Sequence, residues 1–146
     1  MRILGVDYGD KYVGLAMCDP MEMIATPLTT IYRDEEVNLK ATVRQIRALC
    51  EENEIKLIVL GLPKNMNNTE GQRAEKSRAF KKRLERDLYL VDVLLWDERL
   101  TTREAEIPLL ESGMRREQRK KVVDKMAAAI ILQSYLDWKK TQQDHE

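Results

Sequence analysis

The sequence predicts an α/β domain in which a mixed five-stranded sheet is flanked by helices. Three strand-like segments follow one another through short turns, which indicates an antiparallel meander. Two later strand-like segments each come after a helical segment, and such crossovers place them parallel to the first strand. The five predicted strands cover residues 3–6, 12–18, 24–32, 56–61 and 90–96.

Each predicted strand has a local signature. The apolar run at residues 3–6 is typical of a strand that is buried on both faces. Gly14 lies inside the second strand, where the missing side chain lets another backbone or a ligand approach closely. Pro27 directs the third strand to an edge of the sheet, because proline has no N–H to donate. The fourth and fifth strands are short apolar segments.

Helical periodicity appears between and after the last two strands. Residues 34–53 and 71–87 each carry an apolar stripe at helical spacing. A third helix, capped by Thr101 or Thr102, contains Pro108, so we expect a kink or an early end there. A basic connector over residues 113–120 then leads to a final helix over residues 121–140.

Length and composition bound the class of protein. With 146 residues, 43% of them apolar and 34% charged, the chain fits one globular domain over residues 1–140 and a polar C-terminal tail, residues 141–146. The 25 basic and 25 acidic side chains cancel, so any nucleic-acid binding must come from local patches. Two widely spaced cysteines exclude a cysteine-rich zinc module and fit a cytoplasmic location. No apolar run is long enough to span a membrane, and we expect no membrane association.

Asp7 stands directly after the first apolar strand. An unpaired carboxylate at the end of a central strand is costly, and a bound cation would remove that cost. Alternatively, Asp7 caps the following turn by accepting hydrogen bonds from backbone N–H groups. Asp7 is therefore a candidate metal ligand whose partners must come from elsewhere in the chain.

Asp97 and Glu98 stand in the same position after the fifth strand. Ligands of open α/β sheets bind outside the carboxyl ends of parallel strands. Adjacent residues of a strand point to opposite faces, so only one of the two should face a site with Asp7, and Glu98 is preferred. The alternative is that both are solvated or cap the next helix.

Asp124 is the third unusual carboxylate. Helical spacing places it at the head of an apolar stripe with Ala128, Ile131 and Tyr135, which should pack on the sheet. Alternatively, it is a structural residue at a helix start, favoured there by the helix dipole and by nearby lysines.

Together, the three carboxylates suggest a divalent metal centre. Oxygen ligands in this number suit Mg²⁺ or Mn²⁺ rather than zinc. Two such ions can clamp the attacking and leaving oxygens of a phosphoryl displacement. We therefore predict that three residues are catalytic and bind metal: Asp7, Glu98 and Asp124. Two metal ions fit this chemistry better than one.

Polar and basic residues near these carboxylates are candidates for contact with nucleic acid. The loop after the fourth strand offers Asn65 and Asn67, although a turn rich in Asn for backbone reasons has the same composition. A basic face over residues 73–86 is either a phosphate-binding track or a solvated surface. The basic connector is the better candidate because it leads directly into Asp124. The predicted nucleic-acid-binding residues are Asn65, Asn67, Arg99, Arg115, Arg116, Lys121 and Lys125.

Four motifs in this order resemble the YqgF family. Asp7-Tyr8-Gly9 with residues 13–16 resembles its DxG…(I/V)GxA opening, and residues 61–67 resemble its GLPxNxx loop. Residues 97–102 match its DERLTT segment, and residues 124–136 resemble its closing helix. Three residues depart from the family pattern: Tyr12, Asn68 and Pro108. The three carboxylates themselves match it.

The resemblance implies a function as well as a fold. The family consists of Holliday-junction-resolvase-like nucleases implicated in maturing the 5′ end of pre-16S ribosomal RNA. It implies a ribonuclease H-like fold with sheet order 3-2-1-4-5, strand 2 antiparallel, and a two-metal site at Asp7, Glu98 and Asp124. We therefore expect a metal-dependent endonuclease acting on structured RNA, with pre-rRNA and ribosomal particles as partners.

Two alternatives to this function remain open. One is resolution of branched DNA, and the other is a non-catalytic role in ribosome assembly or transcription. The sequence has no obvious interface signature, so we expect a monomer or a weak homodimer.

Overall fold

The computed structural model describes residues 1–33, 39–64, 67, 70–100 and 116–144, and only the backbone of residues 100, 116–124 and 144. Its sheet has the order β3-β2-β1-β4-β5. The strands are β1 (Leu4–Tyr8), β2 (Tyr12–Cys18), β3 (Ala25–Tyr32), β4 (Leu57–Leu62) and β5 (Asp92–Asp97). The helices are α1 (Leu39–Glu52), α2 (Gln72–Asp87), the 3₁₀ turn η1 (Glu98–Leu100) and α4 (Arg116–Asp144).

The strand directions confirm the predicted mixed sheet. β2 is antiparallel to both β1 and β3, which makes the meander. β4 is parallel to β1, and β5 is parallel to β4. Pro27 lies in β3, at an edge of the sheet as expected. The predicted five-stranded sheet, including its order, is therefore correct.

The final helix is longer than predicted at both ends. α4 begins at Arg116, so the prediction of a connector is wrong for residues 116–120. Its helical backbone also continues through residues 141–144 of the predicted tail, where the Thr141 Oγ1 hydroxyl donates to the Asp137 carbonyl at 3.0 Å. The physical reason is that no Gly or Pro follows Gly113, and Arg, Glu, Gln and Lys are good helix formers. The predicted helix around Pro108 and the start of the helix at residue 34 lie outside the described residues.

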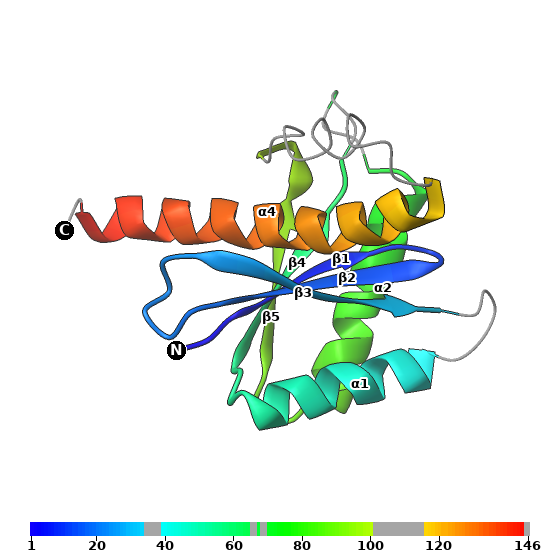
Figure 1. The fold of residues 1–146 in the computed structure, drawn as a ribbon, viewed down its shortest axis with the longest axis horizontal. Helices are drawn as coiled ribbons and strands as arrows, with labels where there is room; N and C mark the ends of the chain where they lie inside the picture. The colour runs from blue at the N-terminus through cyan, green and yellow to red at the C-terminus, as the bar shows by residue number, and fades with distance from the viewer. Residues whose placement is uncertain (34–38, 65–66, 68–69, 101–115, 145–146) are drawn as a thin grey trace.

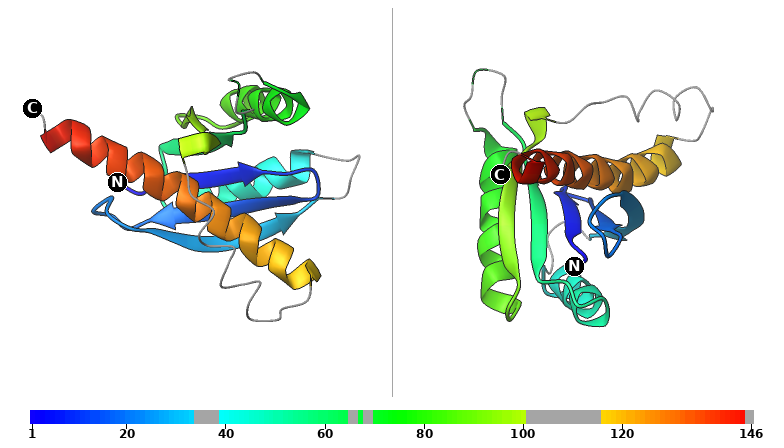
Figure 2. Two further views of the ribbon diagram at one scale, coloured as in Figure 1. Left: turned by 90° about the horizontal axis from the view of Figure 1, so that it is seen from above. Right: turned by 90° about the vertical axis from the view of Figure 1, so that its left-hand side faces the viewer.

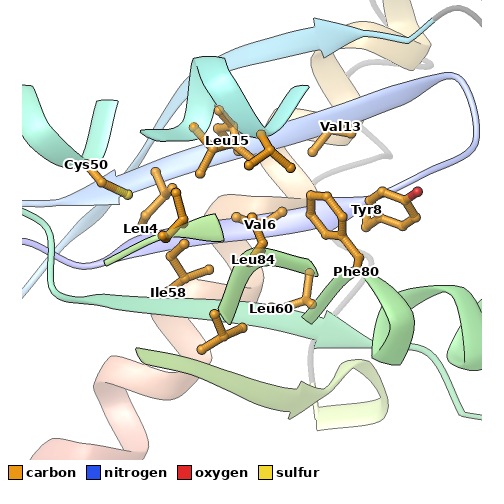
Figure 3. Close-up of a cluster of buried hydrophobic side chains, with 14 of the residues drawn as sticks. Leu4, Val6, Tyr8, Val13, Leu15, Cys50, Ile58, Leu60, Phe80 and Leu84 are labelled. Atoms are coloured by element: carbon orange, nitrogen blue, oxygen red, sulfur yellow. The ribbon is translucent and has the colours of Figure 1, made fainter. Parts of the chain in front are cut away.

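Successive side chains of β1 point to opposite faces of the sheet, and each face packs against helices. Leu4, Val6 and Tyr8 point into the larger core, which α1 and α2 close with Val43, Ile46, Phe80 and Leu84 (Figure 3). Gly5 and Asp7 point to the opposite face, which α4 covers (Figure 1). Figure 2 shows α4 running diagonally across the strands, with its N-terminal end on the side of the β1–β2 turn. No helix in the described residues is both long and apolar enough to cross a membrane.

The end of β1 is held firmly by its last residue, Tyr8. Its ring stacks on Phe80 of α2, with 4.1 Å between ring centroids and 23° between planes. The Arg33 guanidinium lies over the same ring, 4.9 Å from the centroid, and its Nη1 donates to the Gly9 carbonyl at 3.0 Å. Asp7 therefore precedes an anchored residue and does not sit on a loose strand end.

Gly5 lets α4 lie close to the sheet. A Cβ atom at Gly5 would lie 2.8 Å from the Ala128 carbonyl oxygen and 2.8 Å from the Leu132 Cβ atom. Both are backbone or backbone-proximal atoms, so the whole helix would have to move. At Gly61 of β4, a Cβ atom would instead meet the far ends of two flexible side chains, Ile131 and Glu98.

We predict that Gly5→Ala destabilises the fold more than Gly61→Ala. Overpacking against a helix backbone costs about 1–3 kcal/mol. For a chain of this size, each kcal/mol lowers Tm by roughly 2–4 °C. Thermal unfolding of the two variants and the wild type measures the difference, and equal losses of stability would contradict this account of Gly5.

Candidate active site

The structure brings Asp7 and Glu98 together across the sheet. Asp7 is the penultimate residue of β1, and Glu98 is the first residue after β5. Their side chains are hydrogen-bonded to each other and both are half-buried. The two carboxyl groups therefore form one pair, although 91 positions in the chain separate them.

Gly61 makes this contact possible. β4 lies between β1 and β5. Its register pairs Leu60 with Val6, the residue before Asp7, and pairs Gly61 with Trp96 of β5. A Cβ atom at Gly61 would lie 3.0 Å from both Cγ and Oε1 of Glu98. Because Gly61 has no side chain, Glu98 can lie over β4 and reach Asp7.

Burial raises the pKa values of both acids, and the negative charge of Asp7 raises that of Glu98 further. Burial raises the pKa of Asp7, against the opposing effects of its hydrogen bond with Glu98 and of the positive charge of Arg73. Burial, followed by the negative charge of Asp7, raises the pKa of Glu98 to about 8. The pair therefore retains a proton near neutral pH when no cation is bound.

Arg73 is a functional candidate that the sequence reasoning treated only as part of a basic face. It is the second residue of α2, is exposed, and its charge lowers the pKa of both Asp7 and Glu98. The available signal in the sequence was its place in the first turn of the helix that follows the Asn-containing loop. That loop leaves β4, which lies next to Asp7.

Trp96 fixes the end of β5, two residues before Glu98. Its indole Nε1 donates to the Ser134 hydroxyl of α4 at 3.0 Å, and its ring packs edge-on against Tyr135 at 5.6 Å. Trp96 and Glu98 lie on the same side of β5, towards α4, by strand alternation. Trp96 therefore packs against α4 and anchors the strand end that leads to Glu98.

Asp97 has a different environment from Glu98. Its carboxylate accepts hydrogen bonds from the Arg99 guanidinium, with 2.6 Å between Nη2 and Oδ2, and from the Arg99 backbone N–H at 2.9 Å. These bonds lower the pKa of Asp97. Of the two neighbouring acids, Glu98 is thus the one that meets Asp7, while Arg99 is engaged with Asp97.

The remaining predicted site residues are only partly described. Asp124 lies in the helical backbone of α4, one turn before Ala128, whose carbonyl packs against Gly5. Its side chain lies outside the described part of the structure, as do those of Arg116 and Lys121. Asn65 and Arg115 lie outside it entirely, Asn67 is exposed in a turn, and Lys125 is half-buried on α4.

The described donor set fits a divalent cation in part. Two carboxyl groups in contact supply the oxygen ligands that Mg²⁺ and Mn²⁺ prefer, and a cation between them would relieve their repulsion. Among the described side chains, no group of three or more His, Cys, Asp and Glu residues lies together. The side chain of Asp124, the third ligand predicted from the sequence, is not among those described.

Curated relatives match nearly the whole chain. A protein of Agathobacter rectalis is 46% identical over 138 residues, covering 94% of this chain and 96% of its own length. A protein of Lachnospira eligens is 48% identical over 139 residues, covering 95% and 99%. Both carry the name "Putative pre-16S rRNA nuclease".

Solved structures show the same fold at low sequence identity. Thermus thermophilus RuvC in complex with a Holliday junction substrate matches with a TM-score of 0.57 and 16% identity, over 96% of each chain. The fowlpox virus Holliday junction resolvase matches with a TM-score of 0.52 and 18% identity, over 94% of this chain and 99% of its own. The ribonuclease H-like fold expected from the sequence is thereby confirmed.

A family profile described as "RuvX: Holliday junction resolvase" matches residues 1–138. This profile covers most of the chain, and the relatives are more than 40% identical to it over nearly its whole length. The chain belongs to the RuvX family.

Proposed function

We propose that this protein is a metal-dependent endonuclease that hydrolyses phosphodiester bonds in structured RNA, with the 5′ end of pre-16S rRNA as its substrate. The observation that carries the proposal is the hydrogen-bonded pair of Asp7 and Glu98, held by the strand ends of a RuvX-family fold. The names of the curated relatives support RNA as the substrate.

Asp7 and Glu98 would hold the metal, with Asp124 as the proposed third ligand. Bound Mg²⁺ or Mn²⁺ supplies an activated water and neutralises charge on the phosphate. The protein contributes a half-buried carboxyl pair, which would give up its shared proton on binding a cation. The pair is prepositioned because Tyr8 and Trp96 anchor the two strand ends that carry it.

Cationic side chains near the pair would receive the substrate. Arg73 is close enough to affect both acids electrostatically, and its exposed guanidinium can attract a phosphate of the substrate strand. Arg99 and Lys125 are proposed to help stabilise the developing charge, and Asn67 to donate to phosphate or sugar groups. Arg115, Arg116 and Lys121 complete the proposed nucleic-acid contacts.

Branched DNA is the second candidate substrate. The family description and the solved RuvC complex both concern Holliday junctions. Competition between labelled precursor rRNA and an unlabelled four-way DNA junction separates the candidates. If the DNA junction is cut faster and displaces the RNA, the proposed RNA substrate is wrong.

We predict that Asp7→Asn abolishes cleavage of precursor rRNA in Mg²⁺ or Mn²⁺. Loss of a direct ligand should exceed the roughly 10–100-fold cost of losing a group that only supports a ligand. Asp10→Asn is the matched control, because Asp10 lies in the same hairpin but is exposed and pairs with Lys76 at 2.9 Å. Equal rates for Asp7→Asn and wild type would remove Asp7 from the catalytic site, and no cleavage by either protein would favour a non-catalytic binding role.

We predict that the metal-free protein loses stability as the pH rises from about 4.5 to about 8. The folded state holds a proton on Glu98 with a pKa of about 8, against 4.5 for an ordinary Glu, so deprotonation favours unfolding in this window. Glu98→Gln should therefore raise Tm at pH 8 by several degrees and change it little at pH 4.5.

Adding Mn²⁺ at pH 8 should raise Tm of the wild type much more than Tm of Glu98→Gln. Differential scanning calorimetry with and without a chelator measures both effects. A wild-type Tm that is insensitive to Mn²⁺ would remove the metal from the proposal.

A further inference from the structure

We propose that the groove between α1 and α2 is a second binding site for phosphate groups, on the face of the sheet opposite α4, and that it receives the backbone of the nucleic-acid substrate away from the cleavage point. The choice of nucleic acid as ligand rests on the proposed function. The groove itself is a cavity of about 250 Å³. It is lined by Lys40, Val43, Arg44, Arg47, Arg83, Arg86 and Asp87.

The lining contains five basic side chains and a single carboxylate. The chain as a whole has equal numbers of acidic and basic residues, so this groove is a local concentration of positive charge. Figure 1 shows α1 passing the C-terminal end of α2, and the hydrogen bond from Arg47 to the Asp87 carbonyl joins the two helices there. Neutralising one phosphate with each exposed cation is the usual source of affinity for a nucleic-acid backbone.

Asp87 organises the arginines of the groove and leaves the groove positive. Its carboxylate accepts from Arg83 Nε at 2.6 Å and from Arg86 Nε at 2.8 Å, and these bonds lower its pKa to about 2. Arg47 Nη2 donates to the Asp87 carbonyl at 2.6 Å. A guanidinium has five N–H donors. The bonds to Asp87 orient each of these three guanidinium groups and leave other N–H donors of each group for an anion. Less side-chain freedom is then lost when an anion binds.

Lys40, Arg44 and Arg47 form a row of like charges along α1. They are spaced by four and three residues and therefore share one face of the helix, where all three are exposed. Like charges at this spacing destabilise a helix, and a bound polyanion would reverse that effect. The row extends over about 10 Å, at 1.5 Å per residue, which suits a series of phosphates better than one small ion.

α2 connects the groove with the carboxylate pair. Arg73, near the N-terminus of α2, acts on Asp7 and Glu98, and Arg86 in the last turn lines the groove. Thirteen helical residues separate these two arginines, a distance of about 20 Å along the axis. A ligand that occupies both places must therefore be an extended polyanion, as a nucleic-acid strand or duplex is.

The test compares two variants with equal loss of charge. Lys40→Gln/Arg44→Gln alters the groove without touching the Asp87 contacts, and Lys56→Gln/Lys140→Gln removes two exposed lysines elsewhere. The affinity for an RNA duplex of about 20 base pairs is measured by fluorescence anisotropy, without divalent cations, between about 50 and 200 mM salt. Thermal unfolding of each variant verifies that it is folded.

The groove variant should bind the duplex several-fold more weakly than wild type. Its plot of log K against log[salt] should be less steep by about 1 to 2, since each lost phosphate contact removes about 0.9 from the slope. The control should keep the wild-type slope. Unchanged slope in the groove variant, or an equal change in the control, would overturn the proposal. Inorganic phosphate is also added at constant ionic strength. If it abolishes the difference in duplex affinity between the groove variant and wild type, the groove binds a single ion, and this result would also overturn the proposal.

Binding and cleavage can fail independently in this design. Asp7→Asn is included in the same binding series, where it should keep the wild-type slope because it leaves the groove intact. If wild type binds through the groove but does not cleave, the nuclease proposal fails and the groove stands. If Asp7→Asn loses cleavage while the groove variant binds like wild type, only the groove proposal fails.

Discussion

The contact between Asp7 and Glu98 is the constraint on which the organisation of the molecule depends. Two acids placed together in a half-buried position oppose folding, because burial disfavours the charged form of each and the charge of Asp7 further disfavours that of Glu98. The fold holds them there through three adjacent strands: β1 carries one acid, β5 delivers the other, and Gly61 of β4 leaves space between them. Such a locally unfavourable arrangement of titratable groups is typical of functional sites.

Glycines on the α4 face of the sheet determine how closely α4 packs against the strands. Gly5 admits the carbonyl of Ala128, and Gly61 admits the end of Ile131 together with Glu98. α4 therefore lies directly on the central strands, with its N-terminal end on the side of the β1–β2 turn (Figure 2). The same close packing buries the apolar stripe of α4, and Asp124 stands one helical turn before Ala128 in that helix.

Charge is distributed between the two faces of this electrically neutral chain. The acidic pair lies on the α4 side at the carboxyl ends of the strands, and the basic groove lies on the other side between α1 and α2. Several cations of the basic face over residues 73–86 have acidic partners, including Lys76 with Asp10 and Arg83 with Asp87. Net charge alone therefore says little about binding here, because local pairing decides which cations can attract a phosphate.

The sequence alone was enough for the mixed sheet, its parallel crossovers and the edge position of Pro27, since alternation, proline and crossover helices are local or topological signals. The strand order followed from the resemblance to a known family. The sequence also favoured Glu98 over Asp97, because strand parity is a local property. It missed the length of α4, where good helix formers without Gly or Pro continue past the boundaries suggested by charge. Only the tertiary structure could show that Glu98 lies over Gly61, that Arg73 acts on both acids, and that α1 and α2 form one groove. These relations join residues far apart in the chain, and no periodicity within a segment encodes the distance between two segments.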